Sequence, residues 1–168
     1  MASNPVHSFA SIADPGARIL ILGSMPGIAS LQAGEYYAHR QNAFWHIMAE
    51  LLQFDASAPY TLKVAALKSA NIALWDVLQS CSRQGSLDAS IERESAVAND
   101  FVAFFRSQPQ ITQIFFNGAK AEVLFRSQLA AELDISSMRL LRLPSTSPAH
   151  ATLPFAAKLK AWRAILQP

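Results

Sequence analysis

The sequence contains a single cysteine, Cys81, and no long hydrophobic run. One cysteine excludes an internal disulfide and any metal site built from several cysteines. The apolar runs are far shorter than the ~20 residues that a membrane-spanning helix needs. Residues 1–17 lack the basic start and continuous apolar stretch of a signal peptide. We therefore expect a cytosolic protein that does not enter a membrane, with Cys81 as a small, partly buried side chain.

The sequence also lacks a large excess of one charge: it has 14 basic and 12 acidic residues, and its net charge is +2. This balance is too mild to indicate a nucleic-acid partner by itself. The chain after residue 133 is more basic, with one acid, Asp134, and five bases: Arg139, Arg142, Lys158, Lys160 and Arg163. A surface that faces phosphates and an ordinary solvated face explain this bias equally well.

The histidines and carboxylates of the sequence do not show the spacing of a metal-binding motif. Neither His39 nor His46 is spaced with a pair of carboxylates for metal binding. Glu50 follows His46 by four residues, which favours a pair on a helix surface. We expect no metal and no cofactor.

The 168 residues are 51% hydrophobic, which is enough for one domain over residues 1–168 with a sizeable core. Four apolar segments are typical of buried strands: residues 18–23, 71–77, 113–118 and 139–144. Helical spacing of apolar residues occurs over residues 43–52, 90–106 (with a cap at Ser90), 120–133 and 153–166. Residues 56–59 and 80–88 are expected to be loops. This alternation predicts a three-layer α/β/α sandwich with a short, mostly parallel four-stranded sheet.

Unusual residues follow the predicted strands. Residues 23–27 read Gly-Ser-Met-Pro-Gly, Asp76 and Asn117-Gly118 end the next two strands, and residues 144–150 read Pro-Ser-Thr-Ser-Pro-Ala-His. Because right-handed crossovers bring all parallel strand ends to one edge, we expect these segments to meet there and form a ligand site.

Each of these segments also has a simpler interpretation. Residues 23–27 permit close backbone approach to a ligand, or form only a tight turn; they match neither a phosphate loop nor a dinucleotide fingerprint. The hydroxyls of residues 145–147 can donate to a phosphate, and His150 is either functional or a cap residue. Asn117 can bond the edge of a planar base, or serve as a turn residue before Gly118.

These blocks, together with the aromatic segment Tyr36 to Trp45, resemble the uracil-DNA glycosylase superfamily. More narrowly, they resemble its hypoxanthine (deoxyinosine) DNA glycosylase branch, close to the mismatch-specific uracil glycosylases. The resemblance implies base-excision repair by a monofunctional enzyme without a cofactor. Such an enzyme flips a deaminated base out of double- or single-stranded DNA and hydrolyses its N-glycosidic bond. We expect it to act as a monomer.

The resemblance also implies roles for individual residues. Tyr37 matches the ring that stacks on the flipped base, and Asn117 matches the group that reads its edge. Phe44, in the same aromatic block, is also expected to bind the substrate. Ser145, Thr146 and Ser147 match the loop that holds the DNA backbone. Gly23, Ser24, Met25, Pro26 and Gly27 line the base pocket.

The water-positioning residue departs from the pattern of many relatives. Their first motif has Asn or Asp at the position of Met25, which cannot orient water by a hydrogen bond. The resemblance makes Asn42 the candidate instead, although the branch often has Pro-Arg where this chain has Arg40-Gln41. Backbone amides of the loop at Gly23, with His150, would stabilise charge on the leaving base.

Three alternatives remain. Uracil, especially opposite guanine, presents the same donor–acceptor edge as hypoxanthine, and xanthine is a further secondary substrate. A damaged-DNA-binding module with weak or lost catalysis is the second. The third, a serine hydrolase using Ser24 or Ser145, is disfavoured because no nucleophile elbow with acid and histidine partners is present.

Overall fold

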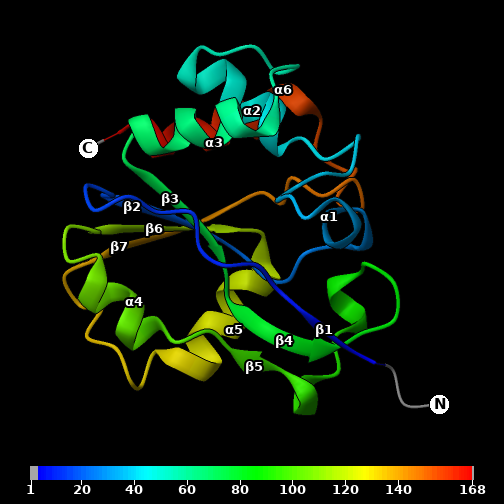
Figure 1. The fold of residues 1–168 in the computed structure, drawn as a ribbon, viewed down its shortest axis with the longest axis vertical. Coiled ribbons are helices and arrows are strands. Elements are labelled where there is room, and N and C mark those ends of the chain that lie inside the picture. Colours follow the sequence, from blue (N-terminus) through cyan, green and yellow to red (C-terminus); the bar gives the residue numbers. More distant parts are fainter. Residues whose placement is uncertain (1–3, 168) are drawn as a thin grey trace.

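A four-stranded parallel sheet forms the centre of the computed structural model, which describes residues 4–167 (Figure 1). The order is β3 (Ile72–Asp76), β2 (Ile19–Gly23), β6 (Gln113–Asn117) and β7 (Arg139–Leu143). All three pairings are parallel, so the four predicted strands and their direction are confirmed. Residues 1–3 and 168 of the predicted domain lie outside the described residues.

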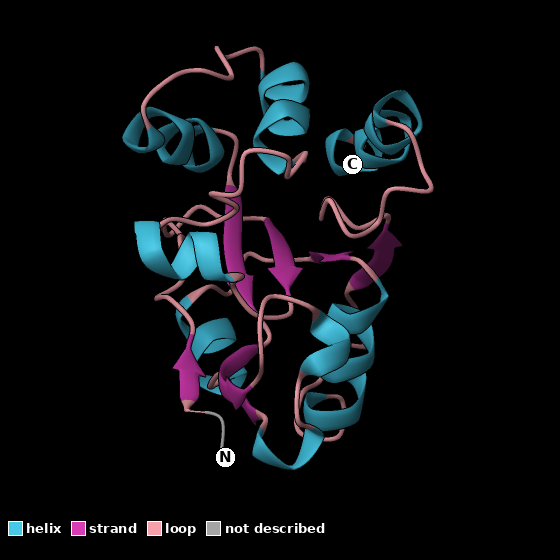
Figure 2. Ribbon diagram, turned by 90° about the vertical axis from the view of Figure 1, so that its right-hand side faces the viewer, coloured by secondary structure: helices cyan, strands magenta, loops and turns pink. Residues whose placement is uncertain are grey.

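Helices cover both faces of this sheet. On one face lie α2 (Phe44–Leu52), α3 (Tyr60–Ser69) and α6 (Phe155–Trp162); on the other lie α4 (Phe101–Ser107) and α5 (Ala119–Leu129). Figures 1 and 2 show the two helical layers with the strands between them. The predicted three-layer sandwich is therefore confirmed.

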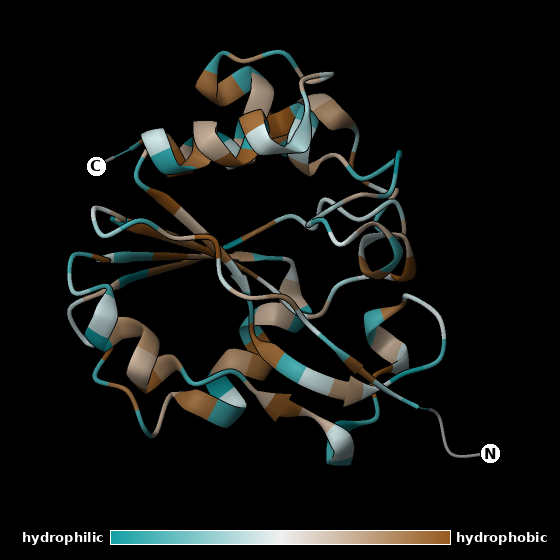
Figure 3. Cartoon of the chain, viewed as in Figure 1, coloured by the Kyte–Doolittle hydropathy of each residue, from teal (hydrophilic) through white to brown (hydrophobic). Residues whose placement is uncertain are grey.

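The side chains of each strand alternate between two apolar cores, as the pleat requires. Leu20 and Leu22 of β2 pack in the core beneath α4 and α5, which also holds Phe125. Ile21, between them, packs in the other core with Phe44 and the other helices. Figure 3 shows hydrophobic residues in the central strands and in the helices that lie on either side of them. Burial on both faces explains why these strands are continuous apolar runs in the sequence.

A second, antiparallel sheet was not predicted. It has the order β1 (Pro5–His7), β4 (Leu78–Ser82) and β5 (Val97–Ala98). The predicted loop 80–88 is therefore wrong over residues 80–82, which belong to β4. Pairing with β1 and β5 satisfies the backbone that the loop prediction had left to solvent.

The predicted helix 90–106 is also wrong over its first half. Two 3₁₀ turns, η1 (Asp88–Ser90) and η2 (Arg93–Ser95), and β5 precede the short helix α4. Ser90 does not cap a helix; the cap is Asp100, whose carboxylate accepts a hydrogen bond from the Ala103 amide at 2.9 Å.

Three helical segments complete the fold. The six-residue helix α1 (Ile28–Ala33) and α3 were not predicted; α3 buries only Leu67 and so lacks an apolar stripe. The predicted helix 153–166 is α6 followed by the 3₁₀ turn η3 (Arg163–Leu166). Within residues 4–167, no helix is long and apolar enough to cross a membrane.

Gly118 joins β6 to α5 in a backbone conformation that favours glycine. Its φ of 92° and ψ of 167° lie in a region that other residues essentially avoid. A Cβ atom here would lie 3.0 Å from the Cβ of Ser145. The chain after β7 can therefore pass directly over the end of β6.

We expect Gly118→Ala to lower the free energy of unfolding by about 3 kcal/mol, because it adds a contact with Ser145 to backbone strain. Gly34 is a matched control: its φ is 68°, but a Cβ atom at this position would have no neighbour within 4 Å. Gly34→Ala should therefore cost only about 1 kcal/mol. Urea denaturation of both variants measures the difference, and equal losses would show that the Ser145 contact is unimportant.

Candidate functional site

A cavity of about 390 Å³ lies at the carboxyl ends of the parallel strands. This is the edge where ligands bind in open α/β sheets, and the volume suits a small ligand. Segments far apart in the sequence meet there. The lining includes these residues named in the sequence analysis: Gly23, Ser24, Met25, Pro26, Gly27, Tyr37, Asn42, Asn117, Ser145, Thr146, Ser147 and His150.

Gly23 forms part of the cavity floor, where β2 and β3 end side by side. It pairs with Asp76 in the parallel register. A Cβ atom on Gly23 would lie 2.4 Å from Asp76 Oδ1 and 2.9 Å from the Tyr37 hydroxyl. Glycine at this position therefore lets a carboxyl group and a phenol pack directly against the backbone.

Tyr37 and Phe44 form a stacked pair of rings. Their centroids are 4.2 Å apart and their planes are inclined by 28°. Phe44 is fully buried and does not line the cavity, whereas Tyr37 does. Tyr37 also has a φ of 55°, a strained value for an aromatic residue. Strain of this kind is common at binding sites, and here it sets one face of Tyr37 on Phe44.

The Asn117 side chain is bonded at both ends to Thr146. Its Nδ2 donates to Thr146 Oγ1 at 2.9 Å, and its Oδ1 accepts from the Thr146 amide at 2.9 Å. Thr146 is only 1% exposed. The predicted base-reading amide thus uses one donor and one acceptor to fix the loop, and it keeps a second Nδ2 proton and a second Oδ1 lone pair. Thr146 has no accessible hydroxyl for a phosphate.

Two further contacts hold the loop of residues 144–150. The Ala43 amide donates to the Thr146 carbonyl at 3.0 Å, and the Trp162 indole donates to the Pro144 carbonyl at 2.9 Å. Within the loop, Ser145 Oγ and Ser147 Oγ accept from backbone amides, each at 3.2 Å. Both hydroxyls keep a proton to donate outward, and His150 is exposed beside them.

Asn42 lies within the aromatic segment, two residues before α2 begins. Its Oδ1 accepts from the Phe44 amide at 3.0 Å, and its own amide donates to the His39 carbonyl at 2.9 Å. These bonds fix the side chain at the cavity wall. A carboxamide oxygen has a second lone pair, so Asn42 can still accept a hydrogen bond from a water molecule.

The family of the chain follows from comparison with known proteins. Residues 10–166 match the family model described as the uracil DNA glycosylase superfamily. The chain belongs to the uracil DNA glycosylase superfamily. The family predicted from the motifs is thus confirmed.

Individual relatives agree with this assignment. Two proteins named hypoxanthine DNA glycosylase are similar to this superfamily member: one from Methanosarcina acetivorans is 39% identical over 119 residues, and one from Methanosarcina barkeri is 35% identical over 116. Each match covers 68% of this chain and 72% of the relative. The NMR structure of a Methanosarcina acetivorans protein, provisionally assigned as a uracil DNA glycosylase, has a TM-score of 0.78 and 28% identity. That alignment covers 98% of this chain and 100% of the other.

The floor of the cavity in this superfamily member carries a buried carboxyl group. Asp76 is 3% exposed, and its Oδ2 has no hydrogen-bond partner among the described residues. Burial and the charge of Asp88 raise the pKa of Asp76 to about 8, while Arg83 opposes the rise. Asp76 is therefore mostly protonated at neutral pH.

Asp88 and Arg83 reach this region from the segment after β4. Burial raises the pKa of Asp88, whose Oδ1 accepts from the Ser24 hydroxyl at 2.6 Å. Arg83 is 5% exposed and donates to the carbonyls of Gly85 and Pro26. The Ser24 hydroxyl thus donates directly to an acid instead of to a histidine base, which weakens the serine-hydrolase alternative further.

Sequence reasoning placed Asp76 at this edge of the sheet without giving it a role, and it did not assign Asp88 to the site. Asp76 had a signal, because a charged residue directly after a run of buried apolar residues is unusual. Asp88 had none, since it falls in a segment predicted to be a loop. Both line the cavity with the predicted residues.

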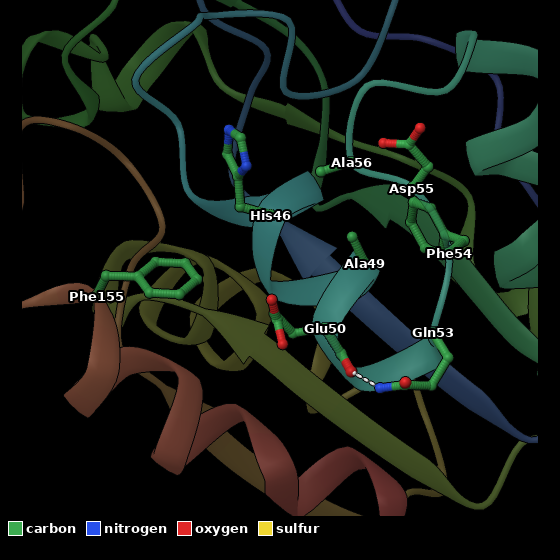
Figure 4. Close-up of a pocket in the computed structure, with 8 residues that line it drawn as sticks. All are labelled: His46, Ala49, Glu50, Gln53, Phe54, Asp55, Ala56 and Phe155. Atoms are coloured by element: carbon green, nitrogen blue, oxygen red, sulfur yellow. Dashed lines mark hydrogen bonds between the residues drawn. The ribbon is translucent and has the colours of Figure 1, made fainter.

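A second hollow, of about 720 Å³, lies on the outer side of α2 (Figure 4). Its lining comes from α2, the loop after it and Phe155 of α6. It contains none of the predicted site residues. No group of three or more His, Cys, Asp or Glu side chains within residues 4–167 is placed to hold a metal ion.

The raised pKa of Asp76 predicts an unusual dependence of stability on pH. The folded state keeps this proton up to about pH 8, whereas an unfolded aspartate loses it near the ordinary value of 3.8. Between these pH values the folded state binds more protons than the unfolded state. The free energy of unfolding should therefore fall by up to roughly 1.4 kcal/mol for each unit by which the pH rises.

Asp76→Asn removes this titration, so its stability relative to the wild type should rise with pH across that window. Urea denaturation at several pH values between 5 and 8 measures both proteins. Parallel curves would mean that Asp76 is ionised in the folded protein.

Proposed function

We propose that this protein releases hypoxanthine from deoxyinosine in DNA by hydrolysing the N-glycosidic bond. The observation that carries the proposal is the meeting of Tyr37, Asn42 and residues 145–150 in one cavity at the ends of the sheet. The names of the two Methanosarcina relatives support the choice of base.

The cavity suits a base that has left the duplex. Glycosylases extrude their target nucleotide into a pocket, and this costs least where the base is already mispaired. Tyr37 lines the cavity and would stack on the flipped base, with Phe44 supporting it from behind. Stacking on an aromatic side chain contributes roughly 1–3 kcal/mol per base.

The loop of residues 144–150 is placed to hold the DNA backbone. Ser145 and Ser147 would donate their hydroxyl protons to phosphates, and Thr146 would keep the loop fixed through Asn117. We propose that the protein acts as a monomer on double- or single-stranded DNA in the cytosol. The mild net charge of +2 favours contacts of this neutral kind over a strongly basic surface.

The reaction needs little activation of water. The bond between the sugar and the base breaks, which leaves positive charge on the sugar and negative charge on the base. Water held by Asn42 adds its oxygen to C1′, and its proton passes to the leaving base. Asn42 is neutral and acts by positioning. Backbone amides of residues 23–27 and His150 would stabilise the charge on the base.

Uracil opposite guanine is the second candidate substrate. The specific observation in its favour is the family itself and the provisional assignment of the NMR neighbour as a uracil DNA glycosylase. Uracil presents N3–H beside O4 just as hypoxanthine presents N1–H beside O6, so the edge alone does not separate the two bases.

Base release from matched oligonucleotides tests the proposal. Each duplex carries one hypoxanthine, uracil, xanthine or thymine, and alkali cleaves the abasic sites that form. We expect the fastest cleavage at hypoxanthine. Cleavage at uracil alone would overturn the base assignment, and binding without any cleavage would favour a damaged-DNA-binding module.

Asn42→Ala tests the water-positioning role. Loss of a positioning group costs about 100-fold in rate, so single-turnover release of hypoxanthine should fall by at least that factor. His46→Ala is the control, because His46 is exposed on the adjacent helix and faces the second hollow instead of the cavity. A loss of less than tenfold in Asn42→Ala would remove Asn42 from the mechanism.

A further inference from the structure

The polar group best placed to meet the edge of a base is not the one that the motifs indicate. Asn117 uses one donor and one acceptor on Thr146, and these two bonds fix the orientation of its carboxamide. Asp76 lines the same cavity, is 3% exposed, and has an Oδ2 atom without a partner among the described residues. Because Gly23 has no side chain, Asp76 Oδ1 can occupy the space beside it. A buried, unpaired polar atom is costly, and a ligand that pairs with it recovers that cost.

We propose that the Asp76 carboxyl group, in its neutral form, recognises the N1–H and O6 edge of flipped hypoxanthine and stabilises charge on O6 as the base leaves. This inference rests on the proposed function. The carbonyl oxygen of Asp76 accepts from N1–H, and its O–H donates to O6. No proton is transferred at Asp76, because the donated hydrogen stays on the carboxyl group while the base gains its proton from water.

The neutral form is essential to this recognition. A protonated carboxyl group offers one donor and one acceptor, which match the edge of a 6-oxopurine. An ionised carboxylate offers only acceptors, and one of them would face O6. As the glycosidic bond breaks, negative charge grows on the base, and a donor aimed at O6 stabilises that charge. Ionisation of Asp76 would therefore weaken both binding and the chemical step.

The surroundings of Asp76 keep it neutral at physiological pH. Asp88 is the nearby acid that raises its pKa, and Arg83 is the nearby base that lowers it. The phenols of Tyr36 and Tyr37 interact with it, and their own pKa values are raised, so both stay uncharged. Burial dominates, and the pKa of Asp76 reaches about 8. Asp76 thus supplies an amide-like donor–acceptor pair whose donor is more acidic than an amide.

Single-turnover release from deoxyinosine and deoxynebularine duplexes tests the assignment. Deoxynebularine carries a purine that lacks both O6 and the N1 proton, so it cannot make the proposed pair. Asp76→Ala should lose about 100-fold on deoxyinosine. Its loss on deoxynebularine should be much smaller, so the ratio of the two rates falls. A merely structural role for Asp76 would lower both rates together and leave the ratio unchanged.

The dependence of the rate on pH provides a second readout. The wild-type rate on deoxyinosine should decline above about pH 8. Asp76→Asn keeps a donor and an acceptor but cannot ionise. It should therefore retain most of the activity that Asp76→Ala loses, and its rate should decline only at higher pH. The base itself also loses its N1 proton in alkali, so a decline that is identical in Asp76→Asn would belong to the substrate and overturn the inference.

Asp88→Asn is the matched control for the neighbouring acid. Since the charge of Asp88 raises the pKa of Asp76, its removal should shift the alkaline decline to lower pH. An unshifted decline would overturn the role of this charge in holding Asp76 neutral.

The two levels of proposal fail differently. Wild-type protein that releases no hypoxanthine would overturn the proposed function, and the role of Asp76 with it. Wild-type release with an unchanged rate ratio in Asp76→Ala would overturn the role of Asp76 alone.

Discussion

The pair of hydrogen bonds between Asn117 and Thr146 determines the shape of the site. It joins the end of β6 to the loop after β7, and that loop in turn bonds the start of α2 through the Ala43 amide. Gly118 permits the close approach by leaving room for Ser145. One amide side chain thus connects the sheet with both the loop of residues 144–150 and the helix that follows Asn42. These bonds therefore fix the position of the loop relative to the sheet.

Much of this fold could be predicted from the sequence, for an identifiable physical reason. Strands buried on both faces must be continuous apolar runs, and the four central strands were found on that basis. Residues 97–98 were wrongly predicted to be helical. They continue the apolar spacing of a helix, yet they form a strand that pairs with β4. Helix α3 was missed because only Leu67 of it is buried. Local pattern fails where tertiary contacts decide the structure.

The sequence predicted where the cavity lies, but it did not predict the contacts that each residue makes there. Strand ends indicated the correct edge, since parallel topology fixes where they meet. Asn117 and Thr146 are 29 residues apart, and no local signal shows that their side chains pair. Phe44 likewise supports Tyr37 from behind and does not reach the cavity. The neutrality of Asp76 depends on burial and on Asp88, which only the folded structure brings near.

The polar atoms that the fold leaves unpaired favour a cavity built for a ligand over one left by imperfect packing. Five buried side-chain atoms within residues 4–167 have no hydrogen-bond partner, and two of them, the Tyr37 hydroxyl and Asp76 Oδ2, belong to residues that line the cavity. Each such group costs roughly 1–3 kcal/mol. These unpaired atoms lie in a protein that otherwise buries two extensive apolar cores. A planar base with a donor and an acceptor on one edge could pair with these atoms, whereas an apolar side chain could not. The same unpaired atoms that lower the stability of the free protein are therefore the ones that we propose to select among bases.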